Sequence, residues 1–193
     1  LVHAENKANI KIQGKINYLK NDKDNAIESN NANVLVQGDK STIEATKGIS
    51  TVNNGIVNLQ ATDSNTIKAQ EFGIYTKENS QVNLNAINVD NIVYVDNGYG
   101  ISGNNSAINI DSQSGNNSIE VAQGIAIEAN NGSNISVNAN KGQNNIKASD
   151  TAISVNKNNI DKDIATTSTN TVVKVTGKDN IINATTAIDN IDG

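Results

Sequence analysis

The sequence has no cysteine, proline, methionine or tryptophan, and all 15 of its basic residues are lysines. The absence of cysteine excludes disulfides and thiolate metal sites. Arginine, the usual bidentate reader of phosphate and guanine, is missing, and no run of lysines replaces it, so we expect no nucleic-acid partner. The longest apolar run is only a few residues, which is too short to cross a membrane as a helix.

Aromatic residues are also scarce, at 3% of the chain, and the net charge is −5. Asparagine instead makes up about one residue in five, far above average usage. A polar chain with few aromatics can be disordered. Regularly spaced β-branched residues argue against disorder here, because they form repeats.

The first repeat is a Gly-Ile or Ala-Ile pair, spaced by 22 to 28 residues with one gap of 35. Its copies are Ala26-Ile27, Gly48-Ile49, Gly73-Ile74, Gly100-Ile101, Gly124-Ile125, Ala152-Ile153 and Ala187-Ile188. This spacing is typical of β-solenoid coils. We call each copy a Gly-Ile segment. We expect its isoleucines, Ile125 included, to stack in the core and the next residues, Ala126 included, to face outward.

Two further repeats follow each Gly-Ile segment. The middle segment alternates apolar and other residues before a small one, as in Val82-Asn83-Leu84-Asn85-Ala86. The Asn segment begins with Asn or Ser and continues with apolar residues at alternate positions, as in Asn65-Thr66-Ile67-Lys68-Ala69. Alternation of this kind has the period of a strand with one buried face. We expect the Asn residues of this segment to form a structural amide ladder along the stack.

The constant order of three short strands predicts an all-β, right-handed parallel β-helix of about seven coils, since crossovers between parallel strands are overwhelmingly right-handed. We expect residues 1–193 to form one such segment, part of a longer protein. Residues 156–170 depart from the repeat, and we expect them to form an enlarged loop on one face.

The sequence offers no convergent chemical site, so we expect no enzyme, no cofactor and no metal. Its carboxylates are scattered, whereas a glycosidase needs two at a fixed separation. His3 is the one histidine. Asp22, Asp24 and Glu28 come closest to a calcium site, but Lys20 and Lys23 interrupt them.

Four of the five aromatic residues fall within two adjoining repeats: Phe72, Tyr75, Tyr94 and Tyr99. Exposed aromatic side chains favour recognition, including sugar stacking and protein contacts. The alternative is that these rings stack only to stabilise the rod. We take the four residues as the candidate binding residues.

The repeats resemble those of autotransporter passenger domains. Gly73-Ile74 with Ser80, Val82-Asn83-Leu84 and Asn91 is one copy of the shared pattern, and Gly100-Ile101 with Ser106, Ile108-Asn109-Ile110 and Asn117 is another. The resemblance covers nearly the whole chain and concerns architecture more than activity. It implies a secreted, surface-exposed stalk of a Gram-negative bacterium, attached to the outer membrane only through a C-terminal barrel outside this stretch.

What the resemblance implies about function is an adhesin or autoaggregation segment, which binds a host cell-surface protein or glycan, or another copy of itself. A passive stalk that spaces a distal domain from the membrane is the first alternative. A carbohydrate-active β-helix enzyme is the second. Fold-level analogy carries much of this expectation.

Overall fold

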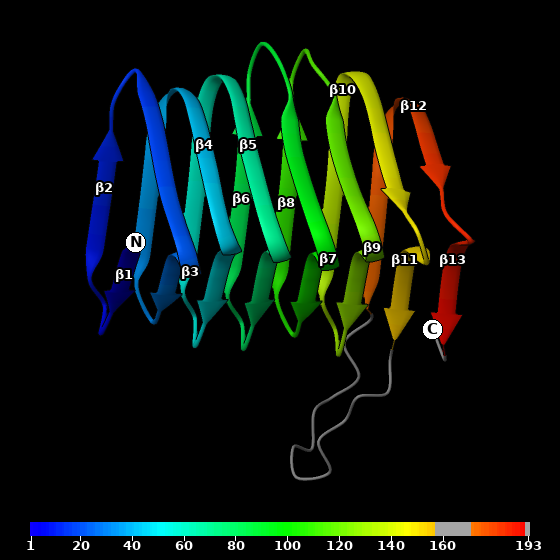
Figure 1. The fold of residues 1–193 in the computed structure, drawn as a ribbon, viewed down its shortest axis with the longest axis horizontal. Coiled ribbons are helices and arrows are strands. Elements are labelled where there is room, and N and C mark those ends of the chain that lie inside the picture. Colours follow the sequence, from blue (N-terminus) through cyan, green and yellow to red (C-terminus); the bar gives the residue numbers. More distant parts are fainter. Residues whose placement is uncertain (157–170, 192–193) are drawn as a thin grey trace, which may run out of the picture.

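The computed structural model describes residues 1–156 and 171–191, and within these ranges the chain is all strand and turn (Figure 1). The strands are β1 (Val2–Glu5), β2 (Asn9–Gln13), β3 (Ile16–Asn30), β4 (Asn33–Val52), β5 (Ile56–Lys77), β6 (Gln81–Ala86), β7 (Asn91–Asn104), β8 (Ala107–Ser112), β9 (Asn117–Asn130), β10 (Asn134–Ala148), β11 (Thr151–Asn156), β12 (Val172–Asn183) and β13 (Thr186–Ile191). The described ranges include no helix with the length and apolarity that a membrane span requires. The predicted loop at 156–170 lies outside the described residues except for Asn156, which ends β11.

The strands stack as successive turns of a right-handed parallel β-helix (Figure 1). Every strand pair in the described ranges is parallel. The middle segments form one ladder through β2, β4, β5, β6, β8, β10 and β12. The predicted solenoid of three segments per coil is therefore confirmed, and we call its three faces the Gly-Ile sheet, the middle sheet and the Asn sheet.

The corner between the Gly-Ile segment and the middle segment interrupts the strands in each coil whose corner lies within the described residues. Asparagines there adopt the left-handed conformation, with φ of 49° at Asn31, 52° at Asn53 and 48° at Asn105. Asparagine tolerates this conformation better than most residues. The side chains also stack: the Asn53 Nδ2 donates to the Asn30 Oδ1 at 2.9 Å. The repeated turn explains part of the high asparagine content.

The core is made of stacked aliphatic side chains. Ile49, Ile74 and Ile101 are fully buried register partners in the Gly-Ile sheet. The predicted place of Ile125 in this stack is wrong. Ile101 pairs with Ile127, which is fully buried, and Ile125 instead lies opposite Tyr99.

A buried amide ladder runs along the Asn sheet, as predicted. The Asn65 Nδ2 donates to the Asn91 Oδ1 at 2.9 Å, and the Asn91 Nδ2 donates to the Asn117 Oδ1 at 3.0 Å. The ladder continues at 2.9 Å from Asn117 to Asn144 and at 2.8 Å from Asn144 to Asn180. Each of these donating amides also binds a backbone carbonyl of the next coil. The ladder therefore ties neighbouring coils together and gives each of these buried amide nitrogens two acceptors.

Candidate functional site

A shallow open hollow of about 570 Å³ lies on the outer face of the Gly-Ile sheet. The β-strands that supply its lining are β3, β4, β5, β7 and β9, which are successive coils of the rod. Its lining residues are Asn25, Lys47, Ser50, Phe72, Tyr75, Tyr99, Ser102, Asn104, Glu128 and Asn130. The long axis of the hollow therefore follows the rod axis.

Three of the four predicted binding residues meet in this hollow. Phe72 and Tyr99 are register partners on β5 and β7, as the sequence predicted. The Phe72 and Tyr75 rings lie 5.6 Å apart between centroids, with a tilt of 47°. In β5 the two residues between Phe72 and Tyr75 are both buried, which interrupts the alternation of the strand. Both rings therefore face outward. The result is an aromatic floor on two neighbouring coils.

Tyr94 is not part of the hollow. It lies half-buried in the Asn segment of β7, where its register partners are Lys68 on one side and Glu120 on the other. Lys147 stands on the next coil and forms an ion pair with Glu120 at 2.9 Å. Tyr94 thus belongs to a row of charged residues on a different face of the rod.

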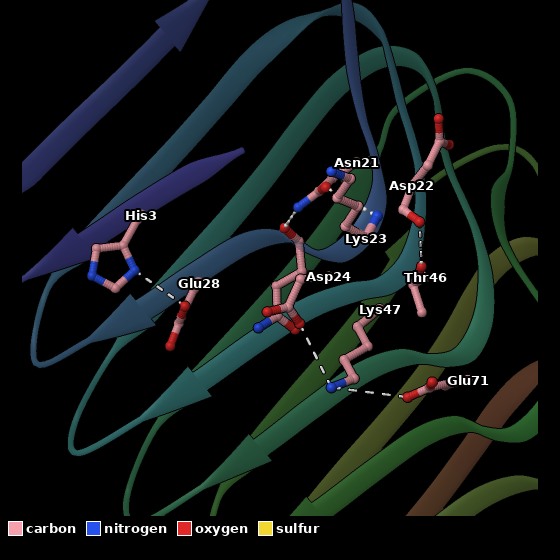
Figure 2. Close-up of polar contacts among 10 residues, drawn as sticks. His3, Asn21, Asp22, Lys23, Asp24, Glu28, Thr46, Lys47 and Glu71 are labelled. Atoms are coloured by element: carbon pink, nitrogen blue, oxygen red, sulfur yellow. Dashed lines mark hydrogen bonds and ion pairs between the residues drawn. The ribbon is translucent and has the colours of Figure 1, made fainter.

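One end of the hollow carries a paired lysine. The Lys47 Nζ lies 3.6 Å from the Asp24 Oδ1 and 3.9 Å from the Glu71 Oε2, so it bridges carboxylates of two neighbouring coils (Figure 2). The same ammonium stands 6.0 Å from the centroid of the Phe72 ring. This geometry is a weak cation–π contact at an exposed site.

The opposite end carries a carboxylate, Glu128 on β9. The buried Ser102 donates its hydroxyl to the Glu128 Oε2 at 2.8 Å. The negative charge of Glu128 raises the pKa of the Tyr99 phenol, and partial burial raises this pKa further. Glu128 therefore stands close enough to Tyr99 for its field to act on the ring.

Sequence reasoning missed Glu128 because it placed Ala126 at this outward position. The register pairs Gly124 with Gly98 and Ile127 with Ile101, which moves the outward residue of this coil to Glu128. The signal was present in the spacing. Asn91 and Asn117 are 26 residues apart, and the same step carries Ser102 to Glu128.

The acidic residues considered for calcium are each drawn to a different partner. Asp24 faces Lys47, and Glu28 accepts from the His3 ring at 3.1 Å (Figure 2). Asp22 lies 3.4 Å from the Lys20 Nζ. The hydrogen bond with Glu28 raises the pKa of His3. These groups form exposed ion pairs, within β3 for Lys20 and Asp22 and between coils for the other two, and such pairs contribute little to stability.

The hollow combines apolar and polar surface, a combination that suits an elongated, amphipathic ligand. Aromatic faces offer apolar contact, while Ser50, Asn104 and Asn130 add hydrogen-bonding groups along the same surface. Pockets of this kind use a few polar groups to orient a ligand on an apolar floor.

Comparisons with protein-family models, with curated proteins and with solved structures found no match for this chain.

Proposed function

We propose that this chain is an adhesive segment of a secreted, surface-exposed protein and that it binds its ligand in the hollow of the Gly-Ile sheet. The observation that carries the proposal is the concentration of aromatic side chains. Phe72, Tyr75 and Tyr99 are three of only five aromatic residues in the chain, and all three line one hollow. The core is built of aliphatic residues, so its packing does not account for a cluster of aromatic side chains on the outer face.

The repeats that resemble autotransporter passengers support an exported location and a role in cell adhesion or autoaggregation. We propose a saccharide on a host or bacterial surface as the ligand, since sugars present apolar C–H faces that stack on aromatic rings between hydroxyl groups that bind polar side chains.

We propose binding without catalysis. Among the described residues that line the hollow, Glu128 is the single carboxylate. Hydrolysis of a glycosidic bond requires a pair of carboxylates on either side of the bond.

The test is an array of host and bacterial surface saccharides and proteins, read with the fluorescently labelled chain. We expect the wild type to bind a set of saccharides and the Tyr75→Ala/Tyr99→Ala variant to lose at least about tenfold in affinity, the equivalent of one well-placed aromatic contact. Tyr94→Ala is the matched control, because it removes an aromatic ring outside the hollow. It should bind as the wild type does.

An array without signal above the double variant would instead support a passive stalk. Signal that is lost in Tyr94→Ala but kept in the double variant would move the binding surface to the Asn sheet. Analytical ultracentrifugation of the same three proteins separates ligand binding from self-association, which we expect the double variant to leave unchanged.

A further inference from the structure

The charges around the hollow determine which saccharides it can accept. Lys47 is held between Asp24 and Glu71, so its charge is already compensated twice. At the other end, Glu128 has no ion-pair partner within residues 1–156 and 171–191. Asp24, Glu71 and Glu128 outnumber Lys47 at the two ends of the hollow, and Lys77, beside Asn104, is paired with Glu78 at 3.4 Å, so the surface is negative at neutral pH. A sulfated or carboxylated ligand would be repelled from it.

Glu128 is placed to receive a cation from the ligand. The Ser102 hydroxyl binds one of its oxygens and fixes the carboxylate beside the hollow. Tyr99 lies on the neighbouring coil, within the field of the same carboxylate. An ammonium seated here gains an ion pair with Glu128 and a cation–π contact with the ring.

At the other end of the floor, a cation of the protein already stands over the aromatic ring, since the Lys47 ammonium lies 6.0 Å from the centroid of Phe72. This arrangement leaves the end at Glu128 for a cation of the ligand. The lining extends over five coils from Asn25 to Asn130, and a step of about 4.8 Å per coil gives a length of about 19 Å. A chain of several sugars matches this length better than a single sugar.

From these observations we infer that the hollow selects saccharide chains that carry free amino groups, lying along the rod axis with an ammonium at Glu128. The inference rests on the proposed function, since it names the ligand class of the same hollow. It goes further in assigning selectivity to one carboxylate, which the aromatic floor alone does not supply.

The experiment compares three oligosaccharides of equal length by isothermal titration calorimetry. They are a glucosamine oligomer, its fully N-acetylated form and a heparin-derived oligomer, at about pH 5.5, so that the amines of the glucosamine oligomer are protonated. We expect the glucosamine oligomer to bind about tenfold more tightly than the N-acetylated form. This advantage should shrink as salt is added, and the heparin oligomer should not bind.

Glu128→Gln tests the assigned residue. It keeps the shape of the side chain and removes the negative charge. The contacts of the sugar with the aromatic floor should remain, while the preference for the amine should disappear. Glu120→Gln is the matched control, because Glu120 lies on the Asn sheet. It should leave the preference unchanged.

Failure of this inference is distinguishable from failure of the proposed function. Equal binding of the two glucosamine forms, with binding still dependent on Tyr75 and Tyr99, would overturn the charge selection and keep the hollow as a sugar-binding site. Tightest binding of the heparin oligomer would overturn the charge selection in the same way. If no saccharide binds here or on the array, both proposals are overturned.

Discussion

At the scale of single residues, the amide ladder of the Asn sheet has one gap. Ser41 stands where the register calls for an asparagine, between Asn17 and Asn65. In the described part of the chain, the Ser41 hydroxyl and the Asn65 Oδ1 are both buried without a hydrogen-bond partner. A buried acceptor without a partner costs stability.

Ser41→Asn should close this gap. The new amide would donate to the Asn65 Oδ1, as Asn65 does to Asn91. We expect the free energy of unfolding to rise by about 1 kcal/mol and the melting temperature by about 2–4 °C. Thermal unfolding followed by circular dichroism measures this. The control is Ser118→Asn, which makes the same change at an outward position of the Asn segment. Equal effects of the two variants, or a loss at position 41, would contradict the ladder.

At the scale of structural elements, the corner between the Asn segment and the Gly-Ile segment depends on stacked glycines. Gly98 and Gly124 are register partners, with φ of 110° and 128°. A Cβ at Gly124 would lie 2.1 Å from the Gly98 carbonyl oxygen. No side chain fits there without moving the backbone.

Gly124→Ala should therefore cost at least about 2 kcal/mol, from the left-handed φ and the backbone clash together. Gly103→Ala is the comparison. There the nearest atoms to an added Cβ are the Ser106 and Ser133 hydroxyl oxygens, both at 3.2 Å. Chemical denaturation of both variants should show a much smaller loss for position 103. If the two substitutions cost the same, this corner does not need its glycines.

The sequence predicted the elements well where one residue type repeats at one position. Val82 and Leu84 of the middle segment align with Ile108 and Ile110 as expected, because strict alternation leaves no other register. The register of the Gly-Ile segment in β9 is harder to predict, because this strand has two candidate pairs, Gly124-Ile125 and Ala126-Ile127. Only the second pair is buried.

The hollow itself could not be predicted from the sequence. Its aromatic floor was visible as a cluster, but its depth depends on side-chain sizes in five successive coils. Small residues such as Ser50 and Ser102 lie beside Tyr75 in register, and they leave space next to the ring. Tyr94 is close to Tyr99 in sequence, yet the corner between them puts the two side chains on different faces.

At the scale of the whole molecule, the rod combines stiffness with one irregular surface. Aliphatic stacks and amide ladders repeat from coil to coil, which suits a stalk. The aromatic hollow occupies a limited part of one sheet, and under the proposed function it is the feature that would distinguish a binding segment from a spacer. Since each coil contacts mainly its neighbours, the hollow depends on the correct register of β5, β7 and β9.

The hollow thus depends on the register that places Glu128 beside Ser102, and disulfide formation measures this register. The chain has no cysteine, so an introduced pair has no competing partner. Neighbouring residues in register lie about 4.8 Å apart, within reach of a disulfide, whereas a shift of two residues separates the Cα atoms by about 8 Å. We expect the Ser102→Cys/Glu128→Cys variant to cross-link on mild oxidation, as detected by peptide mass spectrometry, and the Ser102→Cys/Ala126→Cys variant not to cross-link. Cross-linking of the second pair in preference to the first would contradict the register and, with it, the hollow.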